Sequence, residues 1–350
     1  MQPYNYLTIL ILSLITNLQI IPSHAQTKIQ TWHDSLQTQL KEEYYILEND
    51  SSQLHGSYKK YFSDHKIAVT GYFKKGLKDS VFIEYNETGR IETWYNDDLK
   101  NGPVKIFNKN GTIIQEGYYV NDTLKDTFKV YYGNGKLKQV AIFKNGNPDG
   151  LVKSYYETGK LKEEINYLNN IQNGISRSYY EKGTLKTEAN YKDGVINGFS
   201  RIYYDNGQLE AEHTLTDGEK NGGFRSYNKN GQLILEGRYE DGKLDGENSG
   251  YFDNGNVEHI YHYKLGRKTG LNIAYYPNGS IKKKSVYKNE GKNSKTNIFY
   301  KNGKIKEKQW VKNELKTGLW KYYYANGKIK RIEKYVNGKL IWKKSYLTSL

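Results

Sequence analysis

The sequence predicts an all-β protein, an elongated row of tandem β-hairpins that forms a single twisted antiparallel sheet or open solenoid. Three observations predict this fold. A glycine-centred motif recurs every 24 residues, aromatic and aliphatic residues keep fixed distances from that glycine, and the composition favours strands and turns. Of 350 residues only 36% are hydrophobic, yet 35 are Tyr and 34 are Gly. Such a chain can bury a thin aromatic layer but not a thick aliphatic core.

The period is set by the glycine of segments such as YYETGKL, YYDNGQL and YYANGKI. Successive steps are 24 residues except the first, which is 22. One step before the first glycine stands His65, and His tolerates positive φ better than most residues, so we interpret it as a degenerate twelfth copy. The anchor glycines are Gly89, Gly111, Gly135, Gly159, Gly183, Gly207, Gly231, Gly255, Gly279, Gly303 and Gly327.

Two positions around the anchor are invariant in type, an aromatic residue four before it and an aliphatic residue two after it. Side chains alternate faces along a strand, so loop length decides which residues meet on one face. A three-residue loop, Asp205 to Gly207, pairs Tyr203 with Leu209. Pro277 occupies a place that a type I turn favours. We therefore predict a type I turn with a G1 bulge at every anchor.

A second, longer turn is expected halfway through each repeat, in segments such as KDGVING and EDGKLDG. Neighbouring strands are then antiparallel, because short turns permit no other arrangement. At the C-terminal end, residues 339–344 are expected to form an edge strand protected by lysines.

The N-terminal part divides into two further segments. Residues 1–25 resemble a signal peptide, with an apolar stretch from Leu7 to Ile21 and a small-x-small pattern that predicts cleavage after Ala25. No Lys or Arg precedes the apolar stretch. Residues 26–55 lack the repeat and form an N-terminal cap, in which the spacing of Ile29, Trp32, Leu36 and Leu40 is compatible with a short helix. The hairpins then occupy residues 56–350.

Composition narrows the chemistry. The chain has no Cys, which excludes disulfides, thiol catalysis and Cys-ligated metal. None of the seven His residues repeats in phase, and no nucleophile elbow, phosphate loop or metalloprotease helix is present. We therefore expect no enzymatic activity, no catalytic residues, no cofactor and no metal. The net charge of +15 suits an acidic partner.

One candidate binding surface stands out, and we call it the Tyr/Lys stripe. The residue three before the anchor is aromatic in nine of twelve copies, and the residue three after it is Lys in six. The loop geometry places both sets on the face opposite the invariant pair, which we expect to face outward. Tyr can stack on rings and Lys can meet anions, although both are also ordinary outward strand residues. The stripe comprises Tyr132, Lys138, Tyr156, Lys162, Tyr180, Lys186, Tyr276, Lys282, Tyr300, Lys306, Tyr324 and Lys330.

Segments such as YYDNGQLEAEHTLTDGEKNG and FYKNGKIKEKQW resemble the MORN repeat variant of bacterial proteins often described as YwqK-like antitoxins. The resemblance covers roughly residues 56–345 and implies stacked β-hairpins with a binding or scaffolding role. The family implies no catalytic residues. The segment LWKYYYANGK, with Trp320, is also similar to one choline-binding repeat, but the ladder of regular Trp residues on which those sites depend is missing.

We therefore expect an exported, secreted or periplasmic, non-enzymatic scaffold that binds another protein and in one version neutralises a toxin. The alternative is a module that binds an anionic glycan or envelope polymer through the Tyr/Lys stripe. Nucleic acid is disfavoured as a partner by the export signal. No segment of the mature chain is expected to span a membrane as a helix.

Overall fold

The computed structural model describes residues 26–48 and 50–347. These residues form two compact units, the first ending at Gly111 and the second beginning at Thr112. The described residues contain strands and turns and no helix, which confirms the predicted all-β class. The predicted signal peptide and its cleavage position after Ala25 fall within residues 1–25, which lie outside the described residues.

The first unit is an open antiparallel sheet of seven strands, each paired with the strand before it in the chain. The strands are β1 (Gln26–Trp32), β2 (Leu40–Leu47), β3 (Asp50–Tyr61), β4 (Ile67–Lys74), β5 (Leu77–Asn86), β6 (Gly89–Asn96) and β7 (Leu99–Asn108).

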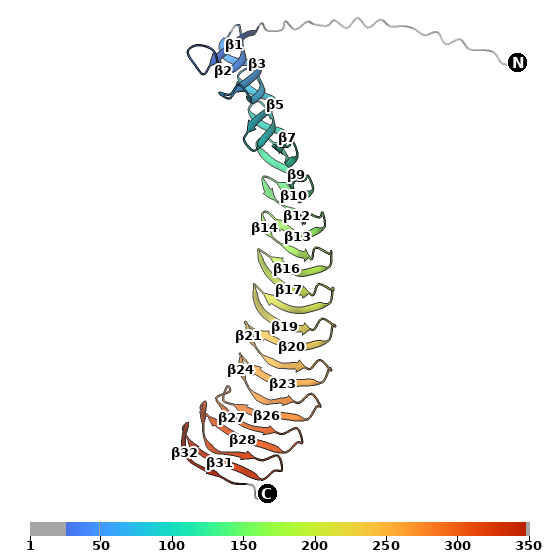
Figure 1. Cartoon of the computed structure of the whole chain (residues 1–350), viewed down its shortest axis with the longest axis vertical. Coiled ribbons are helices and arrows are strands. Elements are labelled where there is room, and N and C mark those ends of the chain that lie inside the picture. Colours follow the sequence, from blue (N-terminus) through green and yellow to red (C-terminus); the bar gives the residue numbers. More distant parts are fainter. Residues whose placement is uncertain (1–25, 49, 348–350) are drawn as a thin grey trace, which may run out of the picture. The chain divides into compact units, whose positions relative to one another are not determined.

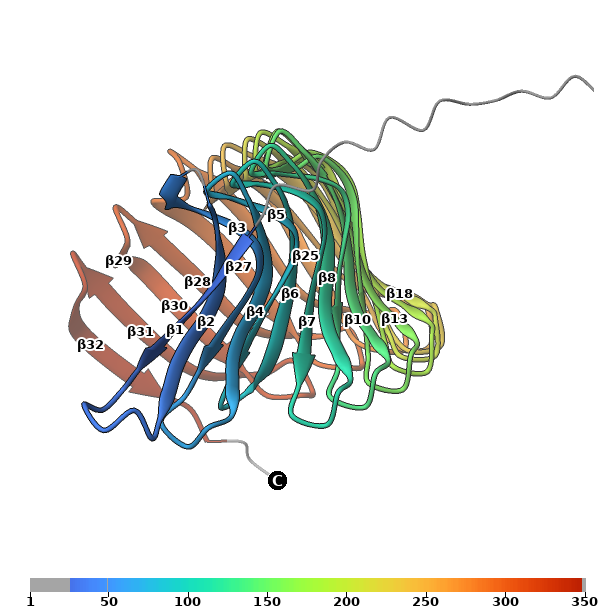
Figure 2. The same ribbon diagram turned by 90° about the horizontal axis from the view of Figure 1, so that it is seen from above.

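The second unit continues the same hairpin pattern, with strands following one another in chain order (Figure 1). Its strands are bowed when viewed along the stack (Figure 2). They are β8 (Ile113–Val120), β9 (Thr123–Tyr131), β10 (Leu137–Lys144), β11 (Asn147–Pro148), β12 (Gly150–Tyr155), β13 (Leu161–Leu168), β14 (Ile171–Gln172), β15 (Gly174–Tyr179), β16 (Leu185–Lys192), β17 (Val195–Tyr203), β18 (Leu209–Thr216), β19 (Glu219–Tyr227), β20 (Leu233–Glu240), β21 (Lys243–Leu244), β22 (Gly246–Tyr251), β23 (Val257–Lys264), β24 (Arg267–Lys268), β25 (Gly270–Tyr275), β26 (Ile281–Lys288), β27 (Asn293–Phe299), β28 (Ile305–Lys312), β29 (Leu315–Lys316), β30 (Gly318–Tyr323), β31 (Ile329–Val336) and β32 (Lys339–Ser345). Every residue of β32 is exposed, in keeping with the predicted edge strand.

The predicted three-residue turn is confirmed at most anchors. Between β17 and β18, Tyr203 is paired with Leu209, and the Tyr204 N–H donates to the Gln208 carbonyl at 2.8 Å. Gly207 has φ 89°, the left-handed conformation that such a loop requires at its last position. His65 takes the same place with φ 66°, so its interpretation as a degenerate anchor is also confirmed.

The turn at Gly89 differs from the prediction. Asn86 pairs with Gly89, which leaves a two-residue loop and places Tyr85 opposite Arg90 instead of Ile91. The Asn86 side-chain oxygen accepts hydrogen bonds from the N–H groups of Thr88 and Gly89 at 2.8 and 3.0 Å. This local side-chain bond stabilises the shorter loop in place of the bulged one.

The second turn of the repeat is tighter than predicted. Lys192 pairs with Val195, so Asp193 and Gly194 alone form the loop, and both have positive φ. A two-residue loop of this type suits Asp-Gly because neither residue is strongly strained there. Gly198, the last residue of the segment KDGVING, does not end the turn but lies within the following strand with φ 114°.

The N-terminal cap is not helical. Residues 26–32 form β1, which pairs antiparallel with β2, and the loop between them is closed by the Asp34 carboxylate, which accepts hydrogen bonds from Thr38 and Gln39. The helical spacing was misleading because the β-branched residues Thr27, Ile29 and Thr31 favour a strand, and pairing satisfies one edge of β2.

The two faces of the sheet are unequally buried. We call the face that carries Tyr203 and Arg201 face A, and the face that carries Ser200 and Tyr204 face B. Residues seven before and six after the anchor are cross-strand partners on face B, and in most repeats they are the best-buried positions. They include Val152, Ser176, Ala189, Phe224, Asn272, Ser285, Thr296 and Trp320.

Side chains of complementary size fill this buried strip. Phe82 has only 1% of its surface exposed. Its ring packs directly on Gly71, so a Cβ atom added to that glycine would lie only 2.4 Å from the Phe82 ring. Phe224 likewise lies against Gly237. Gly71 and Gly237 have no positive φ, so glycine serves here to make room for an aromatic ring and not to form a turn.

Candidate functional site

The structure brings the members of the Tyr/Lys stripe together in pairs. In five of the six repeats the Lys ammonium lies 5.5–5.8 Å from the ring centroid of the Tyr in the same repeat, within the range of a cation–π interaction. The pairs are Lys138 with Tyr132, Lys186 with Tyr180, Lys282 with Tyr276, Lys306 with Tyr300 and Lys330 with Tyr324.

The tyrosine hydroxyls of this stripe also bind the next repeat. Tyr180 donates a hydrogen bond to the backbone carbonyl of Tyr203 at 2.8 Å, and Tyr156 makes the equivalent bond to Tyr179 at 2.7 Å. The same bond recurs in every copy of the predicted stripe. It joins residues 22 or 23 positions apart, so these tyrosines hold consecutive hairpins together. The sequence alone does not reveal this role, because whether a tyrosine hydroxyl reaches a carbonyl of the next repeat depends on the distance between neighbouring hairpins.

The description of this face as outward is wrong for the rings. Tyr180 is half-buried, whereas Lys186 is exposed. Both sets do lie opposite the invariant pair, but Tyr180 is on face B, the same face as the buried Ser176. Residues four apart along an extended segment share a face, and the Tyr180 side chain reaches across to the next hairpin, where its hydroxyl binds the Tyr203 carbonyl. The stripe therefore offers lysine ammonium groups to a partner more readily than tyrosine rings.

Face A carries a charged row that the sequence analysis did not single out. The row takes one residue from each successive strand, and each member is the direct cross-strand partner of the next. Acid and base alternate strictly, with Arg–Glu separations of 2.7–3.6 Å. The charged row is Glu164, Arg177, Glu188, Arg201, Glu212, Arg225 and Glu236.

This row stabilises the stack without leaving unpaired charge. Burial opposes ionisation of Glu164, but the hydrogen bonds from Lys153 and Tyr179 outweigh it and leave the pKa of this carboxyl below its ordinary value. Each partly exposed pair contributes about 0.2–1 kcal/mol. A signal for the row was present in the sequence, since Arg or Lys six before the anchor and Glu five after it recur with the period.

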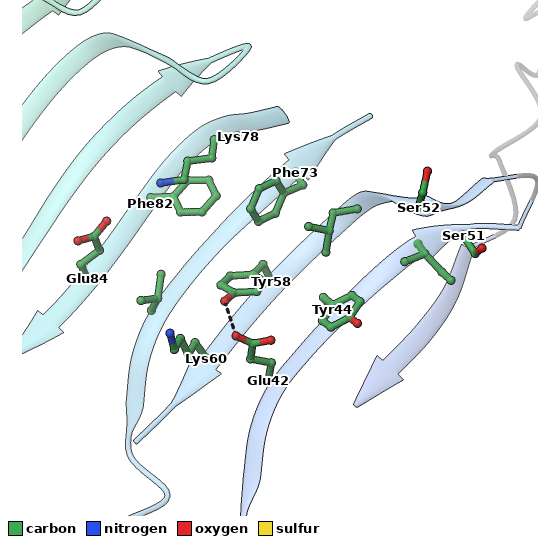
Figure 3. A pocket seen from close by; sticks show the side chains of 13 residues that line it. Glu42, Tyr44, Ser51, Ser52, Tyr58, Lys60, Phe73, Lys78, Phe82 and Glu84 are labelled. Atoms are coloured by element: carbon green, nitrogen blue, oxygen red, sulfur yellow. Dashed lines mark hydrogen bonds between the residues drawn. The ribbon is translucent and has the colours of Figure 1, made fainter. Parts of the chain in front are cut away.

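The first unit contains an open groove of about 580 Å³ on face B, shown in Figure 3. Its floor is a series of edge-to-face aromatic contacts. Tyr58 and Phe73 have ring centroids 5.4 Å apart, and Phe73 and Phe82 5.3 Å. Beyond the groove lining, Phe82 makes a further contact of this kind with Tyr95 at 5.5 Å. Such contacts hold the rings in fixed orientations.

Charged groups flank this aromatic floor. The Tyr58 hydroxyl donates to the Glu42 carboxylate at 3.2 Å, and burial together with that carboxylate raises the pKa of Tyr58 to about 12. The Lys78 ammonium lies 4.9 Å from the Phe82 ring centroid, while Lys60 and Glu84 line the wall (Figure 3). The lining includes no His or Cys, so it offers no nucleophile–histidine pair. The groove suits a peptide side chain with an apolar body and a polar end.

The histidines that the structure describes lie in separate surroundings. Within residues 26–48 and 50–347 no group of three or more His, Cys, Asp or Glu residues is placed to hold an ion. His259 stacks on Tyr261, with ring centroids 4.4 Å apart, and burial lowers its pKa. The His262 Nδ1–H donates a hydrogen bond to the Leu271 carbonyl at 2.7 Å. Among the described residues there is also no helix that could cross a membrane.

Family comparison agrees with this geometry. The model of the family described as MORN repeat variant matches eight segments of the chain, several of them one period apart. The chain is a MORN repeat protein. Each complete match covers one hairpin of the MORN array and runs from one two-residue turn to the next. The matched segments are 100–121, 127–145, 148–169, 172–193, 198–217, 244–265, 268–289 and 316–337.

Comparison with solved structures adds little to the MORN assignment. The crystal structure titled TcdB2-TccC3-Cdc42 is 9% identical, with 92% of this chain and 23% of that chain covered and a TM-score of 0.16. The structure of TcdB2-TccC3 without its hypervariable C-terminal region is 10% identical, with 87% of this chain and 17% of that chain covered and a TM-score of 0.18. The Photorhabdus luminescens Tc holotoxin pore is 9% identical, with 92% of this chain and 23% of that chain covered and a TM-score of 0.17.

The chain thus spans less than a quarter of each of these structures, and TM-scores this low carry no argument about function. No curated protein matches the chain with significance.

Proposed function

We propose that this MORN array is an exported, non-enzymatic scaffold that binds another protein along its sheet. The observation that carries the proposal is the exposure of large aliphatic side chains along the two-residue turns. Leu168 is 53% exposed, its cross-strand partner Ile171 is 49% exposed, and Val195 in the next repeat is 43% exposed. Neighbouring exposed apolar side chains on successive repeats are typical of protein-interaction surfaces.

The open groove of the first unit supports the same proposal. It combines a rigid aromatic floor with acidic and basic walls, which is the composition of an interface centre with a polar rim. Neutralisation of a toxin is one version of this function. Identification of the bound protein as a toxin would support that version. Export through the signal at residues 1–25 is part of the proposal, and N-terminal sequencing of the mature protein should begin at Gln26.

The alternative, a polyanion- or glycan-binding module, draws on the exposed lysines of the Tyr/Lys stripe. The structure supports it less, because the tyrosine hydroxyls are engaged with backbone carbonyls and most of the rings already have a lysine over them. Replacement of Lys138, Lys162 and Lys186 by Glu should abolish binding to heparin if this alternative is right and should leave the unfolding midpoint nearly unchanged.

The test of the scaffold proposal is site-specific photo-crosslinking. A photoreactive residue at Val195 should capture one protein from envelope extract, while the same group at Lys301, on an exposed three-residue turn, should not. The captured protein should then bind the purified array in the presence of excess heparin and moderate salt. Loss of binding under heparin competition, or identical capture at both positions, would contradict the proposal.

A further inference from the structure

The row that alternates in charge along face A changes character near the C-terminal end of the second unit. Beyond Glu236 the cross-strand series continues through neutral Ser249, Ile260 and Ile273. It then becomes basic, and we call this part the basic row. Its members are Lys284, Asn297, Lys308, Lys321, Ile332 and Lys344.

Among the described residues, no carboxylate forms an ion pair with the lysines of the basic row, in contrast to the charged row. Lys308 and Lys321 are direct cross-strand neighbours, an arrangement of like charges that destabilises a sheet. Within the part of the chain that the structure describes, no carboxylate forms an ion pair with either of them. Fold stability therefore does not explain these residues, since the same row alternates in charge and stabilises the stack from Glu164 to Glu236, and is neutral from Ser249 to Ile273.

A groove of about 480 Å³ lies beside the basic row on face A. Lys288, Lys295 and Lys312 line it together with Val286 and Trp310, and its lining includes no acidic residue. Val286 lies two residues from Lys284 on the same strand, so the groove and the basic row form one continuous surface.

Trp310 is held in place although 45% of it is exposed. A Cβ on Gly318 would lie 2.7 Å from the Trp310 ring, so the ring rests directly on that glycine. The Trp320 indole N–H donates to the Trp310 backbone carbonyl at 3.0 Å, and the Lys295 ammonium lies 5.3 Å from the Trp310 ring centroid. A fixed, exposed Trp that lines a basic groove has the character of a binding hot spot.

The apolar residues beside the lysines indicate which kind of anion fits. Leu271 and Val286 are direct cross-strand partners, 40% and 39% exposed, in the row of face A that leads to Trp310. A polyanion without apolar groups leaves these side chains in water, whereas a polypeptide segment can cover them while its carboxylates meet the ammonium groups.

We propose that strands β25–β31 bind an acidic polypeptide segment of the partner, with an apolar or aromatic side chain inserted against Trp310 and carboxylates over the basic row. The inference rests on the proposed protein-binding function and deepens it by naming the class of segment that is recognised.

The test uses the substitution Asn297→Glu, which removes no lysine. Asn297 lies in register between Lys284 and Lys308, so a carboxylate there restores the alternation of the charged row and occupies the site from within. Binding of a fluorescein-labelled 14-residue peptide of Glu, Leu and one Phe is measured by anisotropy. We expect Asn297→Glu to weaken binding about 10-fold and to leave the melting temperature equal or higher.

Gln139→Glu is the matched control, because it adds the same charge at an exposed strand position of the same unit outside the basic row. It should change the affinity less than about 2-fold. Trp310→Ala should weaken binding of the Phe-containing peptide but not of the same peptide with Ala in place of Phe.

Three results would overturn the inference. One is equal peptide affinity in the wild type and Asn297→Glu. Another is that the wild type binds vesicles containing about one fifth anionic lipid, that Asn297→Glu weakens this binding, and that no peptide binding is measurable. That result would assign the surface to a membrane. If the protein captured by crosslinking binds Asn297→Glu as tightly as the wild type, this inference fails while the scaffold function stands.

Discussion

Phe82 shows how a single side chain supports a sheet that has only one layer. Its ring is almost fully buried against Gly71 and lies between Phe73 and Tyr95 in edge-to-face contacts. No second sheet or helix covers the face among the described residues. The burial of this ring therefore comes only from neighbouring strands of the same face.

Replacement of Phe82 by Ala should lower the free energy of unfolding by about 3–5 kcal/mol, because a large buried ring is removed and a cavity remains. Phe62→Ala is the control, since Phe62 is 44% exposed at a turn and should cost less than about 1 kcal/mol. Urea denaturation followed by circular dichroism measures both, and equal losses would show that face B is not the core of this unit.

His213 is a second residue whose surroundings make a prediction. Its ring stacks on Phe224 at 6.0 Å, its Nδ1 atom is buried without a hydrogen-bond partner, and burial together with the nearby Lys220 lowers its pKa below 6.5. The folded state therefore favours the neutral ring. As the pH falls, His213 takes up its proton at a higher pH in the unfolded chain than in the folded protein. The contribution of the neutral ring to the unfolding free energy is therefore fully present above pH 6.5 and is lost as the pH falls toward the folded-state pKa.

His213→Phe keeps the stacked ring and removes the titrating group. We expect the drop in unfolding free energy between pH 7.5 and 5 to be smaller in His213→Phe than in the wild type. His33→Phe is the control, because His33 lies in an N-terminal loop outside the buried strip. Parallel pH profiles for the wild type and His213→Phe would rule out this role.

At the scale of the element, the three-residue turn depends on one left-handed residue. A Cβ on Gly207 would meet nothing within 4 Å, so substitution there tests backbone conformation and not packing. Gly133, the first residue of the three-residue turn that ends at Gly135, also has open space around it, but it has no positive φ.

Gly207→Ala should therefore lower the unfolding free energy by about 1–2 kcal/mol, the cost of placing a Cβ in the left-handed region. Gly133→Ala should be neutral or slightly stabilising, because it only restricts the unfolded chain. The changes in unfolding free energy of both variants are measured from the midpoints of urea denaturation, provided that the dependence of the unfolding free energy on urea concentration is unchanged. A loss for Gly133→Ala as large as that for Gly207→Ala would contradict the turn geometry.

The turn at most anchors could be predicted because its chemistry is local. The anchor loop followed from the requirement that Tyr203 and Leu209 meet on one face. The second turn was predicted too long because the glycine at Gly198 was taken to end the loop, whereas Asp193 and Gly194 close it by themselves. At Gly89 the side chain of Asn86 selected another loop, which period and residue type do not reveal.

At the scale of the whole molecule, each hairpin of the array depends on the hairpins next to it. Backbone pairing, the tyrosine hydroxyl bonds and the charged row all connect neighbouring repeats. Stability in such an array is approximately a sum of repeat and nearest-neighbour contributions.

Deletion of residues 184–207 removes one full period and joins two equivalent positions of neighbouring repeats. We expect this variant to keep its β-sheet circular dichroism and a single cooperative transition, with a modestly lower unfolding free energy. Deletion of residues 184–195 is the control, since it removes half a period and brings together two strands of the same kind. That variant should lose the cooperative transition, and equal stability of the two would contradict the repeat boundaries.

The sequence by itself determined the all-β class, the 24-residue period, the pairing of the invariant aromatic and aliphatic positions, and the family. These features depend on local turn chemistry and on alternation along a strand, which a linear pattern contains. Only the tertiary structure decided that the better-buried strip lies on face B and that Tyr180 and its equivalents bind the next repeat. It also decided that Lys308 and Lys321 are direct cross-strand neighbours, with no acidic partner among the described residues. Those features depend on which residues of different repeats become neighbours, and neighbours 11 to 23 residues apart are set by register and curvature of the sheet.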